Sequence, residues 1–205
     1  MSRTRFDESN KNFTERAHSA AREQVYPHLF KSDTDIEFES VDRGGTDVHD
    51  VLDQQLGVDL RLHVSVERLG QSVPMHVQER FRRPKYRDYQ DVTITKFNNA
   101  SGEESEISKI AAQWLIYGYF EDALGEVQEA ICVNIPVLLR RIAANSVNYD
   151  DDNHNEKQQD FINISFDELD RIGALAFHLD RTKSAKAPVT VDRREKITAW
   201  TISEI

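Results

Sequence analysis

Residues 57–64 read Gly-Val-Asp-Leu-Arg-Leu-His-Val, a stretch in which apolar and polar residues alternate strictly. One face of an extended chain with this sequence carries only Val and Leu, and the other carries Asp59, Arg61 and His63. Such a pattern is typical of a strand that buries one face in a core. The stretch therefore predicts a central strand with a carboxylate, Asp59, near its start.

The flanking sequence extends this strand into a mixed α/β fold. Alternating or β-branched stretches predict further strands at 36–41, 73–82, 91–97, 127–135 and 161–166. Apolar residues at helical spacing predict helices at 12–30, 103–121 and 167–178 and one that starts at Pro136. The remaining expectations are a turn at 42–45, an exposed polar loop at 148–160 and a last strand near Ile197 and Trp200. The order predicts a mixed α+β domain with a central mixed β-sheet flanked by helices.

Composition limits the classes of protein that fit. The chain has 205 residues, a formal net charge of −10 and one cysteine, Cys132, so we expect a single domain over 1–205 without disulfides. No run of residues approaches the ~20 apolar positions of a membrane span, and the N-terminus lacks a signal-peptide pattern. We therefore expect a cytoplasmic protein with no membrane partner. Whether it acts alone or as a homodimer is left open.

The charge is unevenly distributed. Residues 78–88 carry five basic and two acidic side chains, a local net charge of +3, so the rest of the chain carries −13. Three aromatic residues, Phe81, Tyr86 and Tyr89, lie in or next to this basic segment. Cations mixed with rings are typical of surfaces that bind phosphates and stack bases. The basic residues are Arg80, Arg82, Arg83, Lys85 and Arg87. A solvated, salt-bridged segment without a ligand is the alternative.

Two neighbouring predicted strands bring together residues suited to phosphate chemistry. Period-two alternation puts Gln78, Arg80 and Arg82 on one face of the strand at 73–82, and Glu79 on the other. An acid on one strand, with an acid or amide and a cation on the next, can hold a divalent cation and a phosphate together. Asp59, Gln78, Glu79 and Arg80 are therefore the candidate catalytic residues, and Asp59 and Glu79 the candidate metal ligands.

The order helix, three strands, helix, strand, with Asp59 on the second strand and Gln78-x-Arg80 on the third, resembles the PD-(D/E)xK nuclease superfamily. The resemblance covers about 12–138 and leaves a C-terminal extension at about 160–205. It implies a restriction-endonuclease-like core and Mg²⁺- or Mn²⁺-dependent hydrolysis of DNA, with Arg80 at the position of the lysine. A glutamate of the first helix, Glu15 or Glu23, would complete such a site. Gln113 and Tyr117 are similar to the QxxxY signature of the RecB-like branch, whose residues would share one helix face and contact the substrate.

Two departures from this pattern matter for the chemistry. Arginine cannot give up a proton at ordinary pH, so Arg80 can bind phosphate but cannot act as a general base. Glu79 has the strand parity opposite to that of Gln78, so only a bulge would turn it toward a metal at Asp59. Weaker candidates are Asp91 as a second acid and a set of histidines and acids, best explained as surface residues, at His63, His76, Asp47, His49, Asp50 and Asp53.

Three functions fit these residues. The first is a metal-dependent nuclease that acts on DNA, and the second is a catalytically inactive, nuclease-like subunit that binds nucleic acid. In the third, the arginines dock an acidic protein partner. The nuclease is the leading prediction, and Arg80 in place of lysine is the feature that discriminates the second function from it. The acidic remainder of the chain predicts weak binding of nucleic acid away from the basic segment.

Overall fold

The fold is built on an antiparallel meander of three strands, β1 (Ile36–Ser40), β2 (Leu60–Val66) and β3 (Gln71–Arg82). The computed structural model describes residues 4–30, 34–41, 56–66, 70–98, 103–104, 106–154 and 159–182. In the meander Leu60 pairs with Val77 and Leu62 with Met75, and all four side chains are buried on one face. This confirms the strands predicted at 36–41, 57–64 and 73–82. The predicted turn at 42–45 and strand near Ile197 lie outside the described residues.

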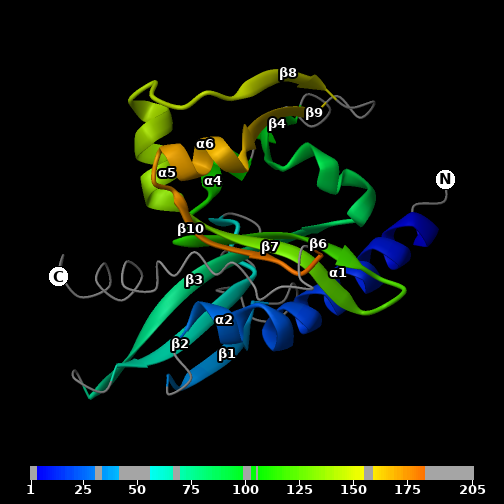
Figure 1. Ribbon diagram of the computed structural model, residues 1–205, viewed down its shortest axis with the longest axis vertical. Helices are drawn as coiled ribbons and strands as arrows, with labels where there is room; N and C mark the ends of the chain where they lie inside the picture. The colour runs from blue at the N-terminus through cyan, green and yellow to red at the C-terminus, as the bar shows by residue number, and fades with distance from the viewer. Residues whose placement is uncertain are drawn as a thin grey trace.

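The first helix covers the buried face of the meander. Helix α1 (Thr4–Gln24) and the short α2 (Tyr26–Leu29) lie against one side of the sheet, and their apolar residues pack on β2, β3 and β7 (Figure 1). Pro27 stands in the first turn of α2, so the predicted helix at 12–30 is confirmed with a break at Val25. Glu15 and Glu23 are exposed residues of α1, the helix that covers this side of the sheet.

The meander continues into a six-stranded mixed sheet. Strand β6 (Trp114–Glu121) lies parallel to β3, and β7 (Glu126–Asn134) and β10 (Leu175–Asp180) follow in antiparallel order. The strand order is β1-β2-β3-β6-β7-β10. A central mixed sheet flanked by helices confirms the predicted fold class and is consistent with a restriction-endonuclease-like core. No helix in the described ranges is both long and apolar enough to cross a membrane.

The helix predicted at 103–121 is wrong. Among the described residues of this range, Glu106–Lys109 (α4) is the helical part. A two-residue strand β5 (Glu103–Glu104) precedes it, and Trp114–Glu121 is the central strand β6. Residues 115–120 are all buried because β6 is covered on both faces. A strand buried on both faces is apolar at nearly every position, so its residues also fit helical spacing.

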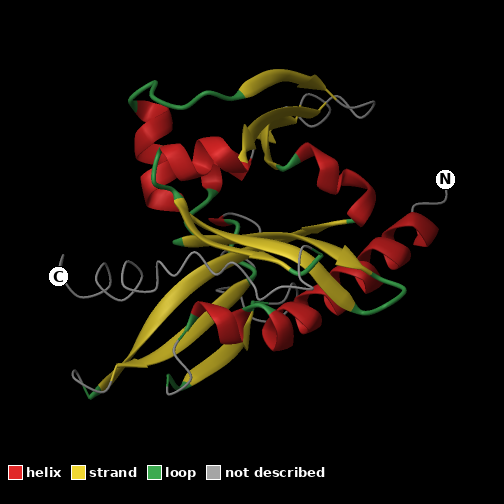
Figure 2. Cartoon of the chain, viewed as in Figure 1, coloured by secondary structure: helices red, strands yellow, loops and turns green. Residues whose placement is uncertain are grey.

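A second, four-stranded sheet, absent from the prediction, lies on the other side of the central sheet (Figure 2). Its order is β5-β4-β9-β8, with β4 (Asp91–Asn98), β8 (Asp150–His154) and β9 (Gln159–Ser165). The strand predicted at 91–97 is confirmed as β4, and the one at 161–166 as β9. The loop predicted at 148–160 is wrong in part, because Asp150–His154 pairs with β9 as a polar edge strand.

Two helices complete the layer that contains the second sheet. Helix α5 (Ile135–Ala143) begins as predicted, with Pro136 in its first turn and the Asn134 side chain accepting from the Val137 N–H at 3.0 Å. Helix α6 (Phe166–Arg171) is shorter than the helix predicted at 167–178. The chain turns at Gly173, whose φ of +75° favours glycine, and then enters β10.

Candidate functional site

The register of β2 and β3 brings the predicted site residues onto two opposite faces. Leu60 pairs with Val77, and the Asp59 N–H donates to the Val77 carbonyl at 3.0 Å, so Asp59 lies opposite Gln78. Alternation along β3 puts Gln78, Arg80 and Arg82 on the same face, away from α1. The face distribution predicted for β3 is confirmed.

Asp59 and Gln78 are neighbouring oxygen-bearing side chains, one directly before β2 and the other on β3. The Asp59 Oδ2 accepts a hydrogen bond from the Glu79 N–H at 2.7 Å, which fixes the carboxylate against β3. Gln78 is buried beside Gly57, where an added Cβ would lie 3.8 Å from the Gln78 Nε2. A carboxylate and a carboxamide fit Mg²⁺, which usually takes one or two protein ligands and completes its shell with water and phosphate oxygens. Within the described residues no group of three or more His, Cys, Asp or Glu side chains could hold a metal ion.

Glu79 lies on the opposite, helix-covered face. The Tyr26 hydroxyl donates to its Oε1 at 2.7 Å, and the His18 Nδ1 lies 3.4 Å from its Oε2. Burial raises the pKa of Glu79 to about 8, with the Asp59 charge adding to the shift, and burial lowers the pKa of His18 to about 4. Both groups are therefore neutral at pH 7, and their contact is not an ion pair. The pairing of β3 shows no bulge at Glu79 that would turn its carboxyl toward Asp59.

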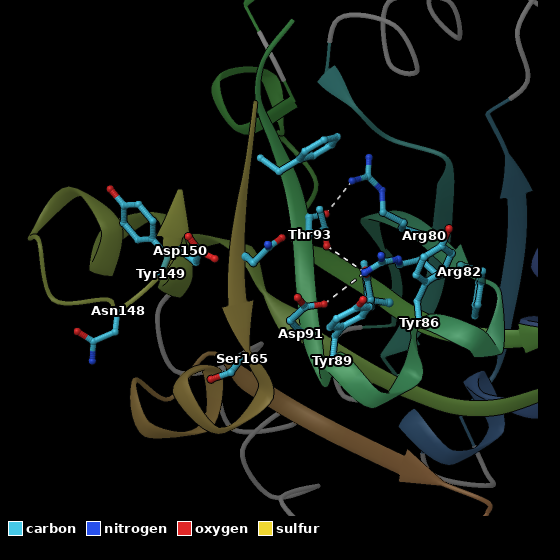
Figure 3. A pocket seen from close by; sticks show the side chains of 14 residues that line it. Arg80, Arg82, Tyr86, Tyr89, Asp91, Thr93, Asn148, Tyr149, Asp150 and Ser165 are labelled. Atoms are coloured by element: carbon cyan, nitrogen blue, oxygen red, sulfur yellow. Dashed lines mark hydrogen bonds and ion pairs between the residues drawn. The ribbon is translucent and has the colours of Figure 1, made fainter. Parts of the chain in front are cut away.

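Arg80 and Arg82 extend from β3 to the edge of β4 (Figure 3). The Arg80 Nη1 donates to the Thr93 carbonyl at 2.8 Å. The Arg82 Nη1 lies 3.3 Å from the Asp91 Oδ1, 3.1 Å from the Thr93 Oγ1 and 3.2 Å from the Tyr117 hydroxyl. Burial raises the pKa of Asp91, and the Arg82 charge opposes that shift. These contacts hold two guanidinium groups in fixed positions between the two sheets.

The two arginines line a cleft of about 1120 Å³ between β3, the second sheet and the 3₁₀ helix η3 (Pro84–Tyr89). The other side chains that line this cleft are mainly aromatic, or polar and uncharged. Tyr89 is 66% exposed and Tyr149 42% exposed, whereas Tyr86 stacks under the Arg82 guanidinium at 4.4 Å. The remaining lining residues are Phe81, Asp91, Thr93, Tyr117, Asn148, Asp150, Phe161, Asn163 and Ser165.

Several of these lining residues were missed at the sequence level. They come from the second sheet, where Phe161, Asn163 and Ser165 alternate with the buried Ile162 and Ile164. That alternation indicates which β9 residues face away from the core. It gives no sign that they face Arg80, since that depends on how the two sheets pack.

The predicted basic segment does not form one surface. Arg80 and Arg82 line the cleft, and the Lys85 ammonium lies 4.8 Å from the Tyr86 ring centre at its margin. The Arg83 guanidinium lies over Phe13 of α1 at 4.6 Å. Arg87 points into the protein, where it bonds Glu129 and Asp180, as described below.

Gln113 and Tyr117 do not share a helix face, because no helix is present there. Gln113 is exposed just before β6, and its Oε1 accepts from the His76 N–H at 2.7 Å. Tyr117 is fully buried within β6, and its hydroxyl reaches the wall of the cleft through Arg82. The joint role that the helical prediction gave them therefore has no structural basis.

The weaker candidates lie apart from Asp59 or outside the described residues. Glu15 forms a pair with Lys11 at 3.7 Å on α1. His63 contacts Glu39 at 3.0 Å on the meander. Asp91, the last of these candidates, lies inside the cleft, where it pairs with Arg82. Asp47, His49, Asp50 and Asp53 are outside the described residues.

No protein-family model and no curated protein matches the chain. Among solved structures, it is similar to a chain described as D212, a nuclease from a fusselovirus, with 10% sequence identity and a TM-score of 0.34. The match covers 84% of this chain and 94% of that one.

Proposed function

We propose that the chain binds nucleic acid in the cleft between its two sheets. The observation that carries the proposal is that Arg80 and Arg82 share this cleft with the exposed rings of Tyr89 and Tyr149. Guanidinium groups pair with phosphates and aromatic side chains stack on bases, so the two kinds of wall suit the two parts of a nucleotide. Both arginines are held by hydrogen bonds that they donate to Thr93 of β4, which lowers the entropy lost when they bind a ligand.

The charge distribution supports binding that is local and sensitive to salt. The chain carries a formal net charge of −10, which repels phosphates over most of its surface. The short basic segment opposes this field locally, and Arg80 and Arg82 are its members inside the cleft. We therefore expect modest affinity that falls steeply as salt rises.

Fluorescence anisotropy with a labelled DNA oligonucleotide tests the proposal. Arg80→Gln removes one phosphate contact, so binding weakens and the slope of log K against log salt becomes shallower by roughly 0.7 to 0.9. Lys11→Gln is the matched control, because it removes the same charge from the exposed surface of α1. Equal affinities for wild type and Arg80→Gln would overturn the proposal and favour docking of an acidic protein.

A second candidate function is hydrolysis of the bound phosphodiester, as a DNA nuclease. It is favoured by the position of Asp59, directly before β2 and opposite Gln78 of β3, with Arg80 on the same face of β3 as Gln78. Asp59 and Gln78 would hold Mg²⁺ or Mn²⁺, which when bound polarises a phosphoryl oxygen and activates water. Arg80 would bind and orient the phosphate, and it takes no part in proton transfer. Glu79, protonated and turned toward Tyr26, would support β3 and leave the cation to the other two residues.

Hydrolysis is tested with purified protein, labelled DNA and Mg²⁺ or Mn²⁺. Cleavage that disappears in Asp59→Asn but persists in Glu79→Gln would support this assignment of roles. Cleavage that survives Asp59→Asn would exclude the site. Binding without turnover, in wild type and both variants, would leave the chain as a nucleic-acid-binding protein of nuclease-like fold.

A further inference from the structure

An exposed tyrosine on a rigid support stands at the end of η3. Tyr89 is 66% exposed, yet Arg87 and Gln90, two residues before it and one after it, are tightly held. The Arg87 Nε donates to the Glu129 Oε2 at 2.6 Å, its Nη2 to the Asp180 Oδ1 at 2.8 Å, and the Gln90 Nε2 to the same Glu129 oxygen at 3.0 Å. Arg87 thus acts as a positioning residue for η3.

The buried carboxylate under Tyr89 is secured from several sides. Glu129 has no exposed side-chain surface, and the His178 Nε2 lies 2.8 Å from its Oε1. The Gln90 carbonyl accepts from the Phe166 N–H at 2.9 Å, which ties the end of η3 to α6. A large ring held out into solvent on such a support is preorganised to meet a flat apolar surface.

Tyr89 also separates two hollows. It lines the large cleft with Arg80 and Arg82, and it lines a second pocket of about 470 Å³ next to α6 and β10. Ser165 is the other residue common to both. The second pocket is within the ~300–1000 Å³ range of small-molecule sites, so it can take a nucleobase.

The two hollows differ in charge, because the cleft combines Arg80 and Arg82 with the carboxylates Asp91 and Asp150, whereas the charged residues described in the second pocket are acidic. No arginine or lysine is among the residues described around the second pocket, which contains Asp167, Asp170 and His178 together with the ring of Phe166. Carboxylates repel phosphate, whereas apolar and hydrogen-bonding walls accept a base. A strand that crosses Tyr89 would therefore leave its phosphates beside the arginines and put a base in the second pocket.

We infer that the nucleic acid bound here is single-stranded, with an unpaired base stacked on Tyr89 at the junction between the two hollows. The inference rests on the proposed function and adds the class of substrate. In a duplex the faces of the bases are covered by their neighbours, so a protruding tyrosine cannot reach them without unstacking. An unpaired strand presents these faces at no such cost.

Anisotropy with the full chain tests this inference with two probes, a labelled single strand of about 16 nucleotides and the same strand in a duplex. We expect wild type to prefer the single strand. Tyr89→Ala lowers single-strand affinity by about 5- to 100-fold, the range expected for loss of one stacked base, and Tyr89→Phe retains it. Leu124→Ala is the control, because Leu124 is equally exposed, at 67%, in the β6–β7 turn and should leave binding unchanged.

The outcomes separate this inference from the function on which it rests. Equal affinity for strand and duplex, or unchanged single-strand binding in Tyr89→Ala, overturns the single-strand inference while the binding function stands. Absence of binding to either probe in wild type overturns both. A parallel titration with the RNA strand distinguishes the two chemical sources of an unpaired base, and the Tyr89→Ala loss is expected with whichever strand binds.

Discussion

Glu79→Gln tests the protonation state of the carboxyl buried on β3. Its pKa is about 8 in the folded chain, against an ordinary value of 4.5, because the side chain is buried. At pH values between 4.5 and 8, the carboxyl group therefore takes up a proton when the chain folds. The contribution of Glu79 to stability is fully present below pH 4.5 and is lost as pH rises toward 8, by about 1.4 kcal/mol per pH unit.

The neighbouring histidine has the opposite dependence. Burial lowers the pKa of His18 from 6.5 to about 4, so its contribution is present above pH 6.5 and is lost as pH falls toward 4. Between pH 4.5 and 6.5 the two groups offset each other. From pH 6.5 to 8 the Glu79 contribution falls by about 2 kcal/mol while the last part of the His18 contribution is gained, so the free energy of unfolding should fall by roughly 1 kcal/mol.

Urea unfolding of wild type and Glu79→Gln at pH 6.5 and pH 8 measures this effect. Glutamine keeps an acceptor for the Tyr26 hydroxyl but does not titrate, so the variant gains about 2 kcal/mol relative to wild type between the two pH values. Glu126→Gln, an exposed change of the same charge on β7, should show no such gain. A constant difference between Glu79→Gln and wild type across this range would mean that Glu79 is ionised in the folded chain.

Three further substitutions test the scaffold around the cleft, each by urea unfolding. Gly118→Ala should lower the free energy of unfolding by roughly 1 to 3 kcal/mol, because the added Cβ would lie 2.6 Å from the Glu129 carbonyl oxygen and 3.0 Å from the Phe81 ring. An unchanged urea midpoint would contradict this close contact between the strands. Asn134→Ala should cost about 1 kcal/mol by removing the N-cap of α5, and no loss would mean that the cap is dispensable. Arg87→Leu should lower the free energy of unfolding by about 3 kcal/mol, since it removes the guanidinium group that pairs with the buried Glu129. An unchanged free energy of unfolding would refute the internal role of Arg87.

The meander could be predicted from sequence because each of its strands has one face in a core and the other face polar. Alternation at 57–64 predicted the strand β2, and parity alone separated Gln78 from Glu79. These are local consequences of a period of two. The protonated state of Glu79 is not local, because it depends on Tyr26 and on the helix that covers the sheet.

The errors fall where tertiary context overrides the local pattern. Strand β6 is covered on both faces, so its continuous apolar sequence fits a helix equally well. Strand β8 is polar because it lies at a sheet edge, and polar composition favoured a loop. The cleft itself depends on the packing of β4 and β9 against β3, and single-sequence periodicity carries no information about that packing.

Photo-cross-linking tests the central claim most directly. A single strand with 5-iodouracil at successive positions is irradiated with the full chain, and the attached peptides are identified by mass spectrometry. We predict attachment to the exposed or half-buried rings of the cleft, Tyr86, Tyr89 and Tyr149, and loss of most of it in Arg80→Gln. Attachment confined to surfaces outside the cleft, or unchanged in Arg80→Gln, would contradict the claim that nucleic acid binds between the two sheets.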